Sequence, residues 1–332
     1  MSTRRISGWM AVAAVVWVML PGMPGAARAA TQTDSSRNAI PRERLCDRAC
    51  LYAVLDQYLN ALVRKDPWRL PWAGFVHVSE NNVPLKVGEG LWGTVSGLGG
   101  YKLRMADPAT GQVAFFGAVD ESGALSPIVI RLKVDEGRIS EAETLVRRAL
   151  DEARVMAEPV YVEKPVLNVL MPEAERLPRE RLISVADGYF DTLQLNDGTL
   201  FTKFADDCNR VENGVQTTNN RALSAISFTL ALGCAEQFRL GNFRYDDRLR
   251  ARRFPLVDVE RGLVLASAFM DHDGRLGEYR LTDGRTNVSG YRRPHSYYLV
   301  ELFKIDGQGA IRQIEAVFMS VPYRTRSVWV DE

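Results

Sequence analysis

Carboxylate, imidazole and phenol side chains occur in the second half of the sequence, where they could carry out acid–base chemistry. Asp206 and Asp258 are candidate bases, His272 and His295 are candidate acids, and Tyr297 is a candidate hydrogen-bond donor. A base, an acid and a donor to a developing oxyanion are sufficient to dehydrate or isomerise a small molecule without a cofactor. The spacing of these residues permits such chemistry without requiring it.

Arg252 completes the candidate set because it lies on the same strand-like segment as Asp258. Alternation with a period of two places both residues on one face of residues 252–259, and it places His295 and Tyr297 on one face of a later segment. The arginine could act with the carboxylate in a site. The two could equally form a structural ion pair on the outer face of a sheet.

The other candidates also have structural alternatives. Asp206 comes shortly before Cys208 and could lie in a turn, while the segment Asp271-His272-Asp273-Gly274 is itself a good turn sequence. His295 follows a proline and could simply be solvated at the start of a strand.

Composition excludes several classes of protein. The chain has 332 residues, of which 46% are hydrophobic and 25% charged, as expected for one or two globular domains. A net charge of +1 gives no basic surface for nucleic acid. The sequence contains no HExxH, GxSxG or Walker A motif and no Cys/His cluster, so we predict neither a metal nor a cofactor.

One literal motif is rejected. Residues 88–93 read GxGxxG, but no predicted strand-to-helix turn surrounds them, and a bulky Leu91-Trp92 pair would obstruct close approach of the backbone to a pyrophosphate. Trp92, Trp68 and Trp72 are interpreted instead as core residues or walls of an apolar pocket.

The two halves of the chain are similar to each other. Residues 55–83 align with residues 186–215 after one insertion, so that Tyr58 meets Tyr189. The ends of the halves repeat as well, in the segments Leu132-Lys133-Val134-Asp135 and Phe303-Lys304-Ile305-Asp306.

This repetition predicts two copies of one domain. We place them at residues 44–149 and 179–332, joined by a proline-rich linker at residues 150–178. The dipeptides Glu80-Asn81 and Glu212-Asn213 occur once in each copy, which favours a structural role at a turn, since a catalytic pair would seldom be needed twice.

Each copy is predicted to begin with a helix and continue with strands. In the first copy, Leu51, Leu55, Tyr58 and Leu62 recur at helical spacing. The predicted strands are 112–119, 128–134, 139–146, 253–259, 263–270, 296–305 and 311–322. We therefore predict an α+β fold of two tandem cone-shaped domains, in each of which N-terminal helices pack on a strongly curved antiparallel sheet.

Two carboxylates stand within apolar strand-like segments. Glu143 and Glu315 would need partners if buried. Lys133 and Lys304, on the facing strands, are the predicted partners.

The repeated pattern resembles the nuclear-transport-factor-2-like (SnoaL-like) cone fold, and more specifically a secreted tandem family of unassigned function. The matching segments are Asp66-Pro67, Glu80-Asn81, Gly88 to Trp92, Phe204 to Cys208, Glu212 to Gly214, Cys234 to Gln237, Arg252 to Asp258, Asp271-His272, Glu301 to Lys304 and Ile314 to Ala316. The resemblance covers nearly the whole chain after residue 43. It implies a conical pocket, which the wider superfamily uses for dehydration, isomerisation, epoxide hydrolysis, aldol cyclisation or plain binding.

The first residues read as a secretory signal. Arg4 and Arg5 precede an apolar run from Trp9 to Leu20, and Ala27-Arg28-Ala29 supplies small residues at a cleavage site after Ala29. We expect residues 1–29 to be removed and residues 30–43 to be a disordered lead. The apolar run is too short for a membrane-spanning helix, so we expect a secreted or periplasmic protein without a membrane anchor.

Export favours disulfide bonds among the four cysteines. We expect the local pairs Cys46–Cys50 and Cys208–Cys234. The first pair could stay reduced, because a bridge across one helical turn requires some distortion. A metal site of all four is the other alternative, although no C-x2-C spacing supports it.

The function predicted from these features is that of an exported, cofactor-independent lyase, hydratase or isomerase. It would act on a small organic molecule in the pocket of the second copy, as a monomer or homodimer. The alternative is a non-catalytic ligand-binding or accessory protein of the same fold.

Overall fold

The computed structural model describes residues 46–148 and 159–330. The predicted signal peptide (1–29) and lead (30–43) lie outside the described residues, as does part of the predicted linker (150–158). Within the described ranges, no helix is both long and apolar enough to cross a membrane.

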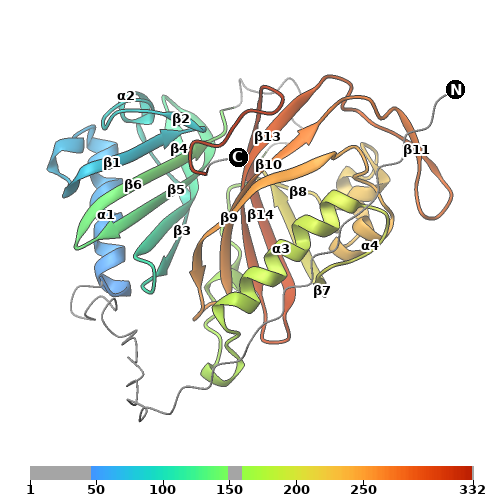
Figure 1. The fold of residues 1–332 in the computed structure, drawn as a ribbon, viewed down its shortest axis with the longest axis horizontal. Helices are drawn as coiled ribbons and strands as arrows, with labels where there is room; N and C mark the ends of the chain where they lie inside the picture. Colours follow the sequence, from blue (N-terminus) through green and yellow to red (C-terminus); the bar gives the residue numbers. More distant parts are fainter. Residues whose placement is uncertain (1–45, 149–158, 331–332) are drawn as a thin grey trace, which may run out of the picture. The chain divides into compact units, whose positions relative to one another are not determined.

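Residues 46–148 form one helix-covered sheet, called the first sheet (Figure 1). Its strand order is β2-β1-β6-β5-β4-β3. The elements are α1 (Arg48–Arg64), β1 (Trp72–Glu80), β2 (Val83–Pro84), α2 (Leu91–Thr94), β3 (Gly97–Asp107), β4 (Gln112–Glu121), β5 (Ala124–Asp135) and β6 (Arg138–Val146).

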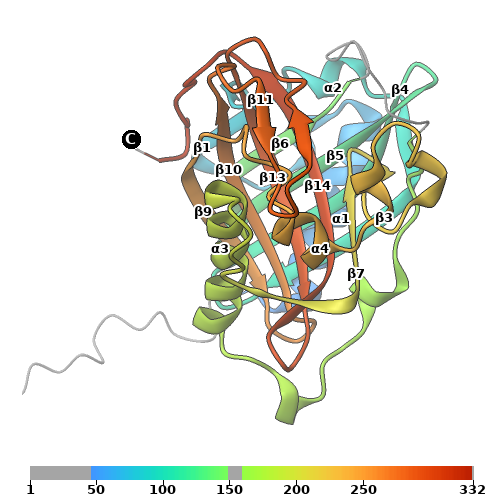
Figure 2. The ribbon, with the colours of Figure 1, turned by 90° about the vertical axis from the view of Figure 1, so that its right-hand side faces the viewer.

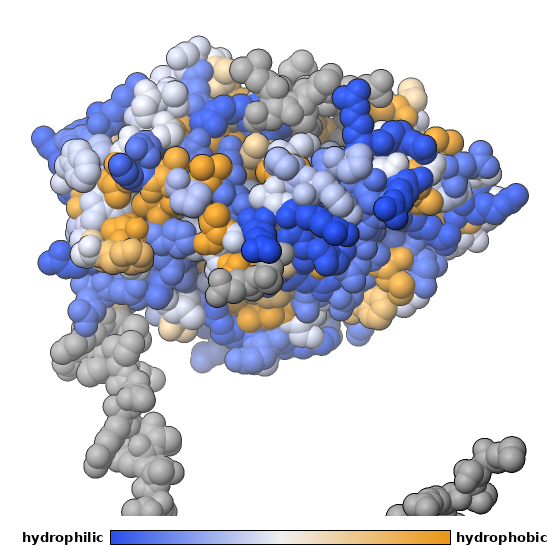
Figure 3. All heavy atoms as spheres, turned by 45° about the horizontal axis from the view of Figure 1, so that its top comes forward, coloured by the Kyte–Doolittle hydropathy of each residue, from blue (hydrophilic) through white to orange (hydrophobic). Residues whose placement is uncertain are grey.

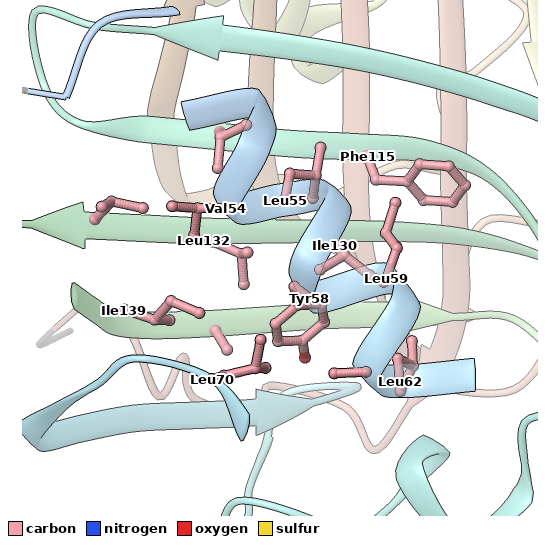
Figure 4. Packing of buried hydrophobic residues seen from close by; sticks show 14 of the residues in the cluster. Val54, Leu55, Tyr58, Leu59, Leu62, Leu70, Phe115, Ile130, Leu132 and Ile139 are labelled. Atoms are coloured by element: carbon pink, nitrogen blue, oxygen red, sulfur yellow. The ribbon is translucent and has the colours of Figure 1, made fainter. Parts of the chain in front are cut away.

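Helix α1 begins and ends where its sequence directs. The Asp47 side chain caps the helix by accepting a hydrogen bond from the Cys50 amide at 2.8 Å, and Lys65 ends it in the left-handed conformation. Figure 4 shows Leu55, Tyr58 and Leu59 pointing from this helix toward the strands. The buried helix face and the sheet fill the first cone with hydrocarbon and aromatic side chains.

The residues after position 178 form the second sheet, whose strand order β8-β7-β14-β13-β10-β9 repeats that of the first. The elements are α3 (Arg179–Leu195), β7 (Lys203–Glu212), β8 (Val215–Gln216), α4 (Cys234–Arg239), β9 (Arg248–Asp258), β10 (Leu263–His272), β13 (His295–Ile305) and β14 (Ala310–Val321). A small hairpin of β11 (Glu278–Arg280) and β12 (Thr286–Val288) lies between β10 and β13 in sequence. Figure 2 shows α3 running along β9.

The fold is therefore α+β, with two sheet-plus-helix units of the same topology. The sheets are mixed, since β1 pairs with β6, and β7 with β14, in parallel, while their other pairs are antiparallel. The predicted strands correspond to β4, β5, β6, β9, β10, β13 and β14. Strands β1, β3 and β7 were not predicted, because Gly97 to Gly100 and the charged residues of β7 obscure the alternation.

Both expected disulfides are present. Cys46 is bonded to Cys50 and Cys208 to Cys234, with Cα–Cα distances of 5.3 and 5.8 Å. The second bond joins β7 to α4 and therefore ties the wall of the second cone to its cover.

The partners expected for the buried glutamates are wrong. Glu143 accepts hydrogen bonds from Arg131 Nε at 2.8 Å and from Tyr298 Oη of the second sheet at 2.6 Å. The guanidinium of Arg253 also pairs with Glu143, so the charge of the buried carboxylate is balanced by cations. Glu315 accepts from Tyr101 Oη at 2.6 Å.

The two lysines lie elsewhere. Lys304 Nζ donates to the Val169 carbonyl at 2.7 Å, and Lys133 pairs with Asp135 at 3.3 Å.

The repeated asparagines have the structural role that repetition predicted. Asn81 exchanges two hydrogen bonds with the backbone of Val146, and Asn213 does the same with Phe318. Both asparagines have positive φ, at 52° and 48°. Each thereby fixes the end of the parallel strand pair in its own sheet.

The glycine-rich motif has no free helix N-terminus for a phosphate. The Leu91 amide at the start of α2 donates to Glu80 Oε2 at 2.6 Å, and Glu80 also pairs with Arg148 at 3.0 Å. Trp92 is buried in the first core, whereas Trp68 is 76% exposed, so the interpretation of Trp68 as a core residue is wrong.

Residues 322–330, which we call the C-terminal strap, run from β14 to the first sheet. Asn82 exchanges hydrogen bonds with the Arg326 carbonyl and the Val328 amide at 2.8 and 3.0 Å. Trp329 stacks on His77 at a centroid distance of 3.9 Å and donates a hydrogen bond to Ser79 Oγ at 3.0 Å.

On the face drawn in Figure 3, hydrophobic residues form small patches separated by hydrophilic ones.

Candidate functional site

The second cone encloses a cavity of about 70 Å³ between its sheet, α3 and the segment after α4. One water molecule needs about 10–15 Å³, so this cavity is large enough for water or a small ligand. Ionisable side chains lining it are Arg210, Glu212, Asp246, His272 and Glu301. Aromatic side chains lining it are Tyr189, Phe243, Tyr245, Tyr291, Tyr297 and Phe318, and Leu193, Met270 and Leu299 complete the wall.

Asp246 and His272 form a buried pair at one side of the cavity. The His272 Nε2 and Asp246 Oδ1 atoms lie 3.3 Å apart. Both ring nitrogens of His272 and Oδ1 of Asp246 lack an aligned hydrogen bond to any described residue. Burial lowers the pKa of His272 to about 4 and raises the pKa of Asp246 well above its ordinary value. His272 is therefore uncharged at neutral pH, and burial favours the protonated form of Asp246.

Glu301 is the second buried acid of the cavity. It lies on the helix-covered side of β13, with 5% of its surface exposed, and its Oε2 atom has no hydrogen-bond partner among the described residues. Burial raises the pKa of Glu301 to about 8, the nearby Glu212 charge adds to this, and Arg210 opposes it. Glu301 consequently carries a proton at pH 7.

Arg210 brings the one strongly basic group to the cavity wall. Its Nε lies 3.0 Å from Glu212 Oε1, and its Nη2 donates to Gln237 Oε1 at 2.9 Å. The guanidinium also stacks against Phe243 at 4.7 Å. Because Glu212 pairs with Arg210, the positive charge of the guanidinium is balanced within the cavity wall.

Aromatic rings form the remaining enclosure. Tyr291, on the loop before β13, lies 4.8 Å from the ring of His272 and 4.7 Å from that of Tyr245 (centroid distances). Tyr297 packs against His272 at 5.2 Å and against Phe318 at 4.9 Å. The rings surround the cavity with apolar surface, and the acids and the imidazole are buried among them.

The cavity exists in the second cone because its residues differ from those of the first. Glu301 and Ile130 each stand three residues before the lysine of the repeated strand segment. The register agrees, since Glu301 pairs with Ala316, a neighbour of Glu212, and Ile130 pairs with Thr144, a neighbour of Glu80.

The strand beside Glu301 differs in the same way. Ala266 of β10 pairs with Glu301, whereas the much larger Phe115 of β4 pairs with Ile130. On β7, Arg210 stands two residues before the repeated Glu-Asn dipeptide, where the first copy has Val78. Figure 4 shows Phe115 and Ile130 filling the first cone.

Three of the sequence-predicted residues gather at this site. His272 and Tyr297 line the cavity. His295 lies behind them, with its ring 4.8 Å from that of His272, and its Nδ1 is hydrogen-bonded to the Arg293 carbonyl at 2.8 Å.

The other three lie away from the cavity. Asp206 is exposed on β7. Arg252 pairs with Asp187 and Asp191 of α3 at 2.9 and 2.7 Å, and not with Asp258. The spacing on β9 misled the prediction, because a β-bulge near Arg253 interrupts the alternation between these residues.

Asp258 is buried in an ion-pair cluster that involves both halves of the chain. It accepts two hydrogen bonds from the Arg48 side chain of α1, at 2.7 and 2.9 Å, and two from the Arg261 side chain, at 2.8 and 3.0 Å. Burial alone would raise the pKa of Asp258, but the hydrogen bond from Arg48 and the charges of both arginines outweigh it and lower the pKa. These contacts give Asp258 a structural role.

The sequence analysis missed Glu301, Asp246 and Arg210 as site residues. A comparison of the two copies contains the signal for two of them, since Glu301 and Arg210 replace Ile130 and Val78 at matched positions. Asp246 has no such signal, because it lies on a segment without a counterpart in the first copy. Among the described residues, no group of three or more His, Cys, Asp or Glu side chains could hold a metal ion.

One family model matches part of the chain. Residues 175–318, less than half of the chain, match the family described as "Domain of unknown function (DUF8021)". No curated protein matches the sequence.

The solved structures with some similarity include one described as having a cystatin-like fold. A protein of unknown function with a cystatin-like fold from Methylobium petroleophilum is 15% identical, with a TM-score of 0.27 over 33% of this chain and 85% of that chain. AusH from Aspergillus nidulans is 12% identical, with a TM-score of 0.28 over 46% of this chain and 90% of that chain. AclR, a putative hydroxylase from Streptomyces galilaeus, is 14% identical, with a TM-score of 0.26 over 46% and 83%.

Proposed function

We propose that the protein is a cofactor-independent lyase, hydratase or isomerase that moves protons on a small organic molecule in the second cone. One observation carries the proposal. Three ionisable side chains, Asp246, His272 and Glu301, line one enclosed cavity and have buried polar atoms without hydrogen-bond partners among the described residues. Such atoms cost stability, so a site that retains them is a candidate for function.

The protonation states supply an acid and a base. Protonated Glu301 has one proton to give, and uncharged His272 has one ring nitrogen able to accept one. His272 would take a proton from a carbon next to a carbonyl group, and the C–H electron pair would form the C=C bond of an enol. Glu301 would protonate the carbonyl oxygen. In a carbonyl compound with a neighbouring C=C bond, His272 returns its proton to the far carbon of that bond while the enol O–H gives its proton back to Glu301, which completes an isomerisation. In a β-hydroxy carbonyl compound, His272 gives its proton to the departing hydroxyl group, which leaves as water while the enol O–H reprotonates Glu301, and this completes a dehydration.

The test is a screen of small carbonyl compounds in D2O, read by mass spectrometry for deuterium gain or loss of water. Wild type is expected to process at least one compound. Both Glu301→Gln and His272→Asn should lower its turnover by about 10²- to 10⁴-fold. Glu315→Gln is the matched control, because Glu315 is buried on the neighbouring strand outside this cavity. Equal turnover in wild type and in both cavity variants would contradict the proposal.

A second candidate function is ligand binding without chemistry. The aromatic enclosure favours it, since Tyr245, Tyr291 and Tyr297 could hold a molecule by contact alone. Stoichiometric capture of a compound that is released unchanged, with no deuterium gained, would favour this candidate.

Export is part of the proposal. The signal-like N-terminal pattern and the two disulfides support a secreted or periplasmic protein. The mass of the mature protein from a secreting host tests it, with cleavage after Ala29 as the expected result.

We also propose that residues 44–149 and 179–332 are two copies of one domain, a division supported by the shared strand order of the two sheets.

A further inference from the structure

We propose that the ligand of the second cone is a small uncharged carbonyl compound, whose oxygen accepts a hydrogen bond from Glu301. The inference rests on the proposed function for its location and adds the class of substrate. It excludes carboxylates and amines as ligands of this cavity.

The balance of charge excludes an ionic ligand. Arg210 is paired with Glu212 within the wall, and its Nη2 is engaged by Gln237. A carboxylate ligand would have to displace Glu212 or remain an unpaired buried charge, and both are unfavourable. An ammonium ligand would have to ionise Glu301 or Asp246, and the burial of both acids opposes this.

The unsatisfied atoms define the polar group of the ligand. A protonated carboxyl at Glu301 is a hydrogen-bond donor, and its Oε2 is buried without a partner among the described residues. A carbonyl oxygen satisfies such a donor without bringing charge. A hydrocarbon would leave it unsatisfied.

The size of the ligand follows from the enclosure. A cavity of about 70 Å³ is larger than the roughly 10–15 Å³ that one water molecule needs, and it limits the ligand to a small molecule. The rings of Tyr291, Tyr297 and Phe318 surround the apolar part of such a molecule.

The test compares three probes of similar size by ligand-observed NMR at pH 7. The probes are cyclopentanone labelled with ¹³C at its carbonyl carbon, cyclopentylammonium and isobutyrate. Cyclopentanone is expected to bind at least about tenfold more tightly than either ion, with a downfield shift of its carbonyl carbon.

Matched variants locate the contact. Glu301→Ile, which installs the residue found in the first cone, should weaken cyclopentanone binding about tenfold or more and abolish the shift. Glu301→Gln keeps a donor and should retain part of the shift, and Glu315→Gln should leave binding unchanged.

The outcomes separate this inference from the proposed function. Cyclopentanone that binds but exchanges none of its α-hydrogens with D2O supports the ligand class and counts against catalysis. Tighter binding of isobutyrate or cyclopentylammonium, no binding of any probe, or an unchanged carbonyl shift in Glu301→Ile overturns the inference whatever the turnover.

Discussion

Glu301 occupies in the second sheet the position that Ile130 holds in the first, three residues before the lysine of the repeated strand. The fold therefore accepts a hydrocarbon at this place, and the first cone is filled where the second is hollow. The carboxyl group at this position is a departure from what stability alone would select.

The first prediction concerns this exchange. Glu301→Ile should raise the free energy of unfolding by about 1–3 kcal/mol at pH 7, because it removes an unsatisfied buried acid. The same substitution should abolish turnover, as in other trade-offs between stability and activity. Urea denaturation and the D2O screen measure the two effects. A variant that is less stable than wild type would show that Glu301 has satisfied partners after all.

The second prediction concerns stability and pH. The folded-state pKa of Glu301, about 8, is above its ordinary 4.5, so its contribution to stability is lost as pH rises from 4.5 to 8. The folded-state pKa of His272, about 4, is below its ordinary 6.5, so its contribution is lost as pH falls from 6.5 to 4. Between pH 4.5 and 6.5, Glu301 lowers the free energy of unfolding as pH rises, whereas His272 raises it. Between pH 6.5 and 8, only Glu301 of these two groups still changes it.

Comparison of wild type with Glu301→Gln isolates the Glu301 slope. Between pH 6.5 and 8, wild type should lose up to about 1.4 kcal/mol per pH unit more than the variant. Denaturant titrations at several pH values check this. Parallel curves for the two proteins would mean that Glu301 titrates alike in the folded and unfolded states.

The third prediction separates a structural carboxylate from a surface pair. Asp258→Ala should destabilise the protein by about 3–5 kcal/mol, because it leaves Arg48 and Arg261 without their buried partner. Arg252→Ala should cost about 1 kcal/mol or less, because its partners Asp187 and Asp191 are 43% and 48% exposed. Similar losses in the two variants, measured by urea denaturation, would refute the distinction.

The fourth prediction concerns the C-terminal strap. Trp329→Ala should lower the free energy of unfolding by about 1–3 kcal/mol, because it removes the stack on His77 and the hydrogen bond to Ser79. Trp68→Ala is the control and should change it by about 0.5 kcal/mol or less, since that ring is 76% exposed. The strap would have no part in holding the first sheet if both variants matched wild type.

Much of the fold could be predicted from the sequence because it is written in local patterns. The helical spacing of Leu51, Leu55 and Tyr58 identified α1, and alternating apolar residues identified seven of the strands. The parallel pairing of β1 with β6 could not be predicted, since register between distant strands leaves no local signal.

The candidate site was harder to predict than the fold. His272 and Tyr297 were found by residue type, but Asp258 was chosen on spacing and belongs to an ion-pair cluster with Arg48. Glu301 was not recognised as a site residue. Glu301 is a candidate because it lines a cavity. That cavity is formed by side chains on several elements, so no pattern near Glu301 in the sequence reveals it.

The measurement that tests this account most directly is the titration of the Glu301 carboxyl group by ¹³C NMR, assigned by comparison with Glu301→Gln. We predict a carboxyl carbon that is missing from the variant and titrates with a midpoint near pH 8. A midpoint near 4.5 would show a solvated carboxylate, and would contradict both the enclosed cavity and the acid–base function proposed for it.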